Sequence, residues 1–333
     1  MKVILSRKGF DSSYGGFPSI ILPKEMGSKM ISFPIPDRKK KKNDVEQIIN
    51  YCFDKTEIAK EKKISLINLL SKIKGKKKIK MPKEKEADPS EFIFHVDPEI
   101  QNMEVKDENA NGEMISFYNR KLGSLGQSSA AAGHLLNNDI DKISANDPTI
   151  FLFFGWFNNT EWKNKQLIPK EKSFHAIWGY LIVDATINIS SDPKIKIPEK
   201  LKNHPHIINK DTYGKKTNII FYGEHYGTLP FNEKLRLTKK DSDNRSNWEI
   251  HNLWKGMNLK KDEITMTYNS NKIKSKLVSN SDKIEFTAAS IGQEFIIKNA
   301  NPKELEKWLI GLGLPRKALD RLKIKQGLCT TSK

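Results

Sequence analysis

Two polar side chains stand two residues apart in a segment with the character of a strand. His95 and Asp97 follow the apolar residues Phe92–Phe94, and Pro98 ends the segment. Residues two apart on a strand point to the same face. The pair could act as a general base beside its acid partner, or as two ligands of a divalent metal. No third ligand is evident, so we assign no metal residues and leave the cofactor open. The alternative is a strand cap at Asp97 and a packed histidine.

A polar, glycine-rich run follows the first expected strand. It contains Ser6, Arg7, Lys8 and Asp11, and then Gly15-Gly16. Glycine lets a backbone approach a ligand closely, and successive N–H groups can form an anion nest. Ser6, Arg7 and Lys8 could therefore hold a phosphate, with Asp11 as an acid–base group. The spacing matches neither a Walker A loop nor a dinucleotide-binding loop. The alternative is a polar turn in which Asp11 accepts hydrogen bonds from the backbone.

An alanine-rich helix is expected over Ser128–Asn138. Gln127 directly precedes it and could contact a base or sugar edge. The start of the helix could also bind an anion, since helix N-termini favour anionic ligands. His134 lies inside the helix and is a further candidate for proton transfer. The alternative is that the small residues only permit close packing against a sheet.

The most aromatic stretch of the chain is Thr149–Phe157. Alternation along a strand places Phe151, Phe153 and Phe157 in the core and leaves Phe154 or Trp156 exposed. An exposed Trp156 could stack on a base, because every base offers a π-face.

Other motifs are weak or absent. His204-Pro205-His206 is expected in a loop and fits a metal site only weakly. The sequence has no G-x-S-x-G, C-x-x-C or H-E-x-x-H motif. Its two cysteines, Cys52 and Cys329, lie in a basic segment and in the tail, so neither a disulfide framework nor cysteine catalysis is expected.

Positive charge is concentrated in one segment. The chain has 58 Lys and Arg against 40 Asp and Glu, a net charge of +18, and residues 38–86, with 17 basic and 7 acidic residues, hold ten of these eighteen excess charges. This predicts contact with an anionic polymer, nucleic acid first. The alternatives are a solvated lysine-rich insertion and the codon bias of an AT-rich genome. The candidate phosphate-contacting residues are Lys39, Lys40, Lys41, Lys42, Lys76, Lys77 and Lys78.

Length and composition indicate a folded protein. With 333 residues and 37% hydrophobic side chains, the chain can build a sizeable core. The opening segment turns polar at Ser6, and no stretch is long and apolar enough for a membrane span. We therefore expect a cytoplasmic protein with no membrane partner.

The periodicity of the chain predicts an α+β fold with a mixed β core, peripheral helices and a lysine-rich helical insertion. The expected divisions are a strand and glycine-rich loop at 1–37, the insertion at 38–90, the main core at 91–300 and C-terminal helices with a tail at 301–333. Strands are expected at 2–6, 19–22, 29–33, 92–96, 149–157, 174–183, 217–222, 234–237, 263–268 and 293–297. Helices are expected at 44–54, 56–74, 128–138, 302–312 and 316–323.

Several strings taken together resemble the nucleotide modification associated domain family, third type. They are ILSRKGFDSSYGGFPSIIL, MISFPIPD, HVDPEI, GQSSAAAGHL, FLFFGWF, GYLIV, HPH and GQEFII. The resemblance implies an association with DNA base hypermodification in phages and bacteria, including defence against phages. The polar residues of those motifs are Ser6, Arg7, Lys8, Asp11, His95, Asp97, Gln127 and His134. Residues 147–184 are also similar in pattern to a PUA-like barrel.

The leading hypothesis is a protein that binds a nucleotide or a DNA base and takes part in base modification, most simply as an enzyme. Arg7 and Lys8 would hold a phosphate, Asp11 or the His95 and Asp97 pair would move protons, and Trp156 would stack on the base. The alternative is a non-enzymatic reader of modified DNA that uses the basic arm. The reaction, the base and any protein partner are left open.

Overall fold

The computed structural model describes the following residues: 1–38, 48–52, 63–76, 78–82, 85–108, 114–116, 122–143, 148–189, 195–202, 204–208, 217–251, 264–266, 275–277, 283–287, 294–297 and 302–327. Within them, none of the helices combines the length and the apolar character that a membrane crossing needs. The fold is α+β and dominated by sheets, as expected from the sequence.

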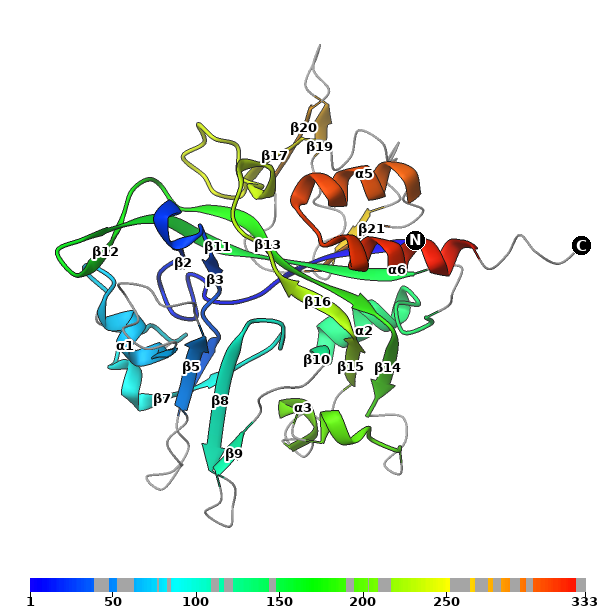
Figure 1. Cartoon of the computed structure of the whole chain (residues 1–333), viewed down its shortest axis with the longest axis horizontal. Coiled ribbons are helices and arrows are strands. Elements are labelled where there is room, and N and C mark those ends of the chain that lie inside the picture. Colours follow the sequence, from blue (N-terminus) through cyan, green and yellow to red (C-terminus); the bar gives the residue numbers. More distant parts are fainter. Residues whose placement is uncertain are drawn as a thin grey trace, which may run out of the picture.

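One mixed sheet forms the centre of the molecule (Figure 1). Its middle strand, β1 (Lys2–Arg7), runs parallel to β11 (Thr149–Lys163) and antiparallel to β21 (Glu294–Ile297). Beyond β11 come β13 (Phe174–Val183) and β16 (His225–Thr228), and beyond β21 comes β18 (Ile264–Met266). The sheet also includes β2 (Ser19–Ile21), β3 (Met30–Ile31) and β12 (Gln166–Pro169).

Four smaller sheets surround the central one. Their strands are β10 (Gly123–Ser128), β15 (Asn218–Gly223) and β14 (Ala185–Asn188) in the first; β17 (Asn247–His251), β20 (Lys283–Thr287) and β19 (Ser275–Leu277) in the second; β4 (Ile35–Arg38) and β7 (Phe92–His95) in the third; and β6 (Lys63–Ser65), β5 (Ile48–Cys52), β8 (Met103–Glu108) and β9 (Met114–Ser116) in the fourth. The helices are α1 (Leu66–Ser71), α2 (Ser129–Asn137), α3 (Pro205–Ile208), α5 (Pro302–Leu312) and α6 (Arg316–Gly327).

Both faces of the central sheet are covered. Figure 1 shows α5 and α6 on one side of β11 and β13, and α2 with β10, β15 and β14 on the other. All ten residues of β13 are buried, the pattern of a strand packed on two faces rather than one. The expected exposure of Phe154 or Trp156 is therefore wrong: their exposed fractions are 2% and 9%.

Three other expectations need correction. The helix expected over 44–54 is a strand, β5, at Ile48–Cys52, because Ile49 and Tyr51 alternate into the core between two neighbouring strands. Within the range 56–74 expected to be a helix, the described residues from Lys63 onward contain the strand β6 and then the helix α1. The strand expected at 234–237 is a short 3₁₀ turn at Glu233–Leu235, capped by Asn232. The described strand pairings do not show the PUA-like barrel.

The line of β1 is interrupted beside β11. Arg7 lies opposite Phe154, and the chain then leaves the sheet in the glycine-rich loop before β2 resumes the line with Ser19 opposite Phe157. Gly155 faces this interruption, where a Cβ atom would lie 2.8 Å from the carbonyl oxygen of Lys8. The polar residues that end β1 thus stand where the loop departs from the sheet.

Candidate functional site

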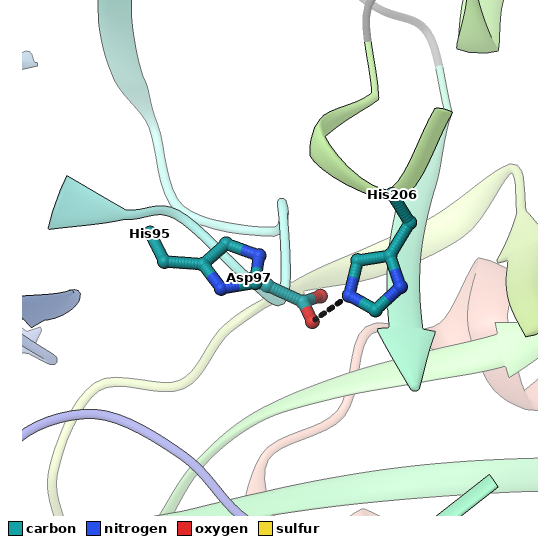
Figure 2. A group of neighbouring side chains, drawn as sticks. All are labelled: His95, Asp97 and His206. Carbon is teal, nitrogen blue, oxygen red and sulfur yellow. Dashed lines mark ion pairs between the residues drawn. The ribbon is translucent and has the colours of Figure 1, made fainter. Parts of the chain in front are cut away.

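His95, Asp97 and His206 converge into one cluster (Figure 2). His95 ends β7, Asp97 follows it, and His206 comes from α3. One ligand atom from each residue lies within 4.8 Å of those of the other two. The two imidazole rings are 5.6 Å apart, and Nε2 of His206 is 3.8 Å from Oδ2 of Asp97. The expected pairing of His95 with Asp97 thus gains a third member that the sequence had placed in a loop.

Main-chain and amide groups fix the orientation of this cluster. Oδ1 of Asp97 accepts a hydrogen bond of 2.9 Å from the amide of Gly126, on β10. Nδ1 of His206 lies 2.7 Å from Oδ1 of Asn218, and Nδ2 of Asn218 donates to the carbonyl of His206. Gly126 leaves room for the imidazole, because a Cβ atom there would lie 2.3 Å from Cδ2 of His206.

Burial keeps both imidazoles neutral. Desolvation lowers the pKa of His95 to about 4, although the carboxylate of Asp97 opposes the shift, and the charge of Lys8 adds to it. Desolvation also lowers the pKa of His206, against the influence of Asp97 and Asn218. Neutral imidazoles beside a carboxylate can accept a proton or bind a cation.

A buried hydrogen-bonded group lies on β1 and its neighbours. Oε1 of Glu294 accepts hydrogen bonds of 3.2 Å from the hydroxyl of Ser6 and from the amide of Gln127. All three side chains are buried. These hydrogen bonds connect β10 and β21 to β1. Ser6 directly precedes Arg7, and Gln127 directly follows Gly126.

Arg7 points to the opposite face of the sheet from Ser6, as strand alternation requires. There it is close enough to Arg245 and Asp11 for their charges to act on it: burial lowers the pKa of Arg7, Asp11 raises it and Arg245 lowers it further. The guanidinium of Arg245 lies 4.1 Å from the ring centre of Trp156, a cation–π contact. The ring of Trp156, which the sequence predicts to stack on a base, therefore packs against Arg245 instead.

A third buried histidine accompanies these arginines. Nδ1 of His175 accepts a hydrogen bond of 3.1 Å from Nε1 of Trp248, so that nitrogen carries no proton. Burial holds the pKa of His175 well below its usual range, and the charges of Arg7 and Arg245 lower it further. Nε2 of His175 is buried without a hydrogen-bond partner among the described residues.

The glycine-rich loop folds as a turn closed by Asp11. Its Oδ1 accepts hydrogen bonds from the amides of Ser13 and Tyr14, at 2.6 and 2.7 Å. Gly15 exchanges two backbone hydrogen bonds with Lys80, which brings the lysine-rich segment against the loop. In that segment Lys76 and Lys78 are exposed, whereas Lys39–Lys42 and Lys77 lie outside the described residues.

His134 is not a member of the cluster formed by His95, Asp97 and His206. It lies on α2, where its carbonyl accepts a hydrogen bond from Asn138. Four members of these sites were not predicted from the sequence: His175, Arg245, Asn218 and Glu294. No local spacing marks them, although the string GQEFII contains Glu294.

The sheet and its polar clusters define an α+β protein with candidate sites at the end of its central strand. The chain matches the family described as nucleotide modification associated domain 3 over residues 2–298, and it belongs to that family. This confirms the resemblance found in the sequence and connects the chain with nucleotide modification. Neither the curated proteins nor the solved structures contain a match.

Proposed function

We propose that this chain is an enzyme that modifies the base of a nucleotide, free or within DNA. The observation that carries the proposal is the arrangement at the end of β1. Lys8 lies close enough to His95 and His206 for its charge to lower their pKa values, whereas Arg7, one residue earlier, lies near Arg245 on the other face. Cationic groups that can hold a phosphate thus adjoin groups that can move a proton.

Each polar group has a distinct part in this proposal. Neutral His95 or His206 accepts a proton from the reacting base, and Asp97 stabilises the imidazolium that results. Lys8, on the face of these histidines, holds the phosphate. Arg7, whose guanidinium could bind two phosphate oxygens at once, is a second candidate on the other face. A small pocket beside Asp97 is lined in part by Gly9, Pro98 and Trp178 and has room for about one water molecule. The roles of Asp11, Gln127 and His134 stay predictions.

The test compares cells that express the chain with cells that express the variant Asp97→Asn. DNA and the nucleotide pool are digested to nucleosides and analysed by mass spectrometry. Asparagine keeps an oxygen for the amide of Gly126 but removes the charge, so a modified nucleoside should be present with the wild type and absent with the variant. Asp241→Asn, at an exposed position, is the matched control. Equal amounts of product from wild type and Asp97→Asn would contradict the proposal.

Phosphate binding is tested separately with purified protein. Titration with nucleoside mono- and triphosphates in a calorimeter should show affinity about ten-fold or more lower for Arg7→Met, because a charge-assisted hydrogen bond is worth about 1.5–3 kcal/mol. Arg316→Met, at an exposed position of α6, is the control. Unchanged affinity of Arg7→Met would remove Arg7 from the proposed site.

A second candidate function is a non-enzymatic reader of modified DNA. It is favoured by the exposed lysines 74, 76, 78 and 80, which lie on the segment held against the glycine-rich loop by Lys80. For a DNA-binding chain, the triple variant Lys76, Lys78 and Lys80→Ala should reduce the slope of log affinity against log salt by about 3. The same substitution of Lys303, Lys307 and Lys317 on α5 and α6 is the control, since Figure 1 shows those helices far from α1. An enzyme of free nucleotides would be unaffected by either triple.

A further inference from the structure

The geometry points to a site for a divalent transition-metal ion formed by His95, Asp97 and His206. This goes beyond the proposed function and alters one part of it, because an imidazole nitrogen that binds a metal cannot also accept a proton from the reacting base. The donor set contains two imidazoles and one carboxylate, a combination suited to first-row metals such as Zn²⁺, Fe²⁺ or Co²⁺.

The hydrogen bonds of Asn218 determine which nitrogen of His206 is available. Nδ2 of Asn218 is the atom that can donate, and it donates to the carbonyl of His206 at 3.2 Å. The oxygen Oδ1 must then face Nδ1 of His206, so Nδ1 carries the proton and donates it over 2.7 Å. A neutral His206 therefore directs the lone pair of Nε2 toward Asp97.

This leaves two acceptors facing each other. Nε2 of His206 and Oδ2 of Asp97 are 3.8 Å apart, longer than a hydrogen bond. Oδ1 of the same carboxylate is already directed at the amide of Gly126, which orients Oδ2 toward the imidazole. A metal ion between them could bind both acceptors at once.

The separations within the cluster fit one ion. Ligand atoms at about 2.1 Å from a shared metal lie at most about 4.2 Å from one another. The contact between His206 and Asp97 is already inside this limit, and the cluster as a whole lies within 4.8 Å. A small rotation of the side chains would complete the site. Three protein ligands leave coordination positions for water or a substrate, as in catalytic rather than structural metal sites.

The surroundings resemble the outer shell of a metal site. A metal-bound histidine usually donates its second N–H to an oxygen, as His206 does to Asn218, and the bound carboxylate is itself hydrogen-bonded, as Asp97 is to Gly126. The charge of Lys8 opposes a cation here, so the affinity reflects the ligands rather than a general negative potential.

The test is titration of the full chain with Co²⁺ and with Zn²⁺ alone after removal of metals with a chelator. The wild type should bind one equivalent, and bound Co²⁺ should give visible absorption bands that Zn²⁺ abolishes by displacement. Asp97→Asn and His206→Ala should lose more affinity than the roughly 10- to 100-fold that an outer-shell substitution costs. His225→Ala, a histidine on β16 outside the cluster, should bind as the wild type does.

Asn218 tests the positioning of His206. Asn218→Leu removes the acceptor for Nδ1 and should weaken Co²⁺ binding about 10- to 100-fold, whereas Asn218→Asp restores an acceptor oxygen and should recover most of it. Thermal unfolding of each variant establishes that it is folded, and Asp97→Asn serves if His206→Ala does not fold.

Two results would overturn the inference: a wild type that binds neither ion, or one whose affinity and spectrum are unchanged in Asp97→Asn. These outcomes are distinct from failure of the proposed function, because no nucleotide is present. If the chain binds the metal at these residues but leaves nucleosides unmodified, the metal site stands and the proposed reaction is rejected.

Discussion

The two faces of the sheet at the end of β1 each hold a buried histidine whose proton is fixed by a neighbour, yet their companions differ. On one face His206 stands with His95 and the carboxylate of Asp97. On the other, His175 accepts a hydrogen bond from Trp248 and stands with two arginines. The first set gathers groups that bind cations, and the second gathers cations. The charged groups beside a buried imidazole, rather than the imidazole itself, thus indicate whether the site favours a cation or an anion.

Alternation along β1 separates these two environments. Ser6 points toward Glu294 and Gln127, and Arg7 points to the face that carries Arg245 and His175. Lys8, where the loop leaves the sheet, lies near the first histidines again. Of three successive residues, Ser6 and Lys8 therefore contribute to one face of the sheet and Arg7 to the other.

The substitution Gly126→Ala should have the largest effect, and it should change the face that carries His206. The added Cβ atom would lie 2.3 Å from the His206 ring, so the imidazole must move away from Asp97. We expect loss of Co²⁺ binding and a decrease of about 1–3 kcal/mol in the free energy of unfolding. Calorimetry and urea unfolding measure the two quantities.

Gly133→Ala is the matched control for this change. Gly133 lies in α2, where an added Cβ atom would have no described atom within 4 Å apart from its chain neighbours and the backbone of its own helix, and alanine favours a helix by about 1 kcal/mol. The control should be at least as stable as the wild type and bind Co²⁺ equally. Retention of full binding by Gly126→Ala would show that His206 is not held as described.

The arginine face should respond to acid. Because the pKa of His175 is lowered in the folded chain, the unfolded chain takes up a proton below about pH 6.5 that the folded chain does not. The free energy of unfolding should therefore fall as pH decreases from 6.5. His175→Gln removes this proton and should flatten the dependence by up to about 1.4 kcal/mol per pH unit.

Urea unfolding at several pH values between about 4.5 and 7.5 measures that slope. Arg7 and Arg245 are the charged groups that act on His175, and both stay cationic throughout this range. An identical slope in wild type and His175→Gln would mean that His175 is protonated in the folded chain, and the contrast between the two faces would be lost.

Lys8→Met should give the smallest effect, and it should change the affinities for Co²⁺ and for nucleotide in opposite directions. Removing a cation near His95 and His206 should strengthen Co²⁺ binding a few-fold and weaken nucleotide binding. Lys24→Met, at an exposed position of a 3₁₀ turn, should change neither. Parallel changes in both affinities would contradict separate roles for metal and phosphate.

The sequence predicted the parts of these sites that are local. The spacing of His95 and Asp97, the glycine-rich loop after β1 and the helix after Gln127 follow from alternation and turn composition, and the structure has each of them. His206 could not be predicted, since it is the long-range packing of α3 against β10 and β15 that brings its ring beside His95 of β7. Arg245 and His175 were missed for the same reason. Trp156 was misplaced because sequence alternation does not reveal a sheet that is covered on both faces.

The position of β1 has a consequence for the biosynthesis of the protein. One edge of this strand is closed by β11, but the other is closed only by β21, whose Glu294 is 288 residues from Ser6. While the chain emerges from the ribosome, β1 has an open edge until its last partner is made, and open edges invite pairing with other chains. Glu294 also accepts the hydrogen bonds of Ser6 and Gln127, so the hydrogen-bonded centre of the molecule is completed late in synthesis.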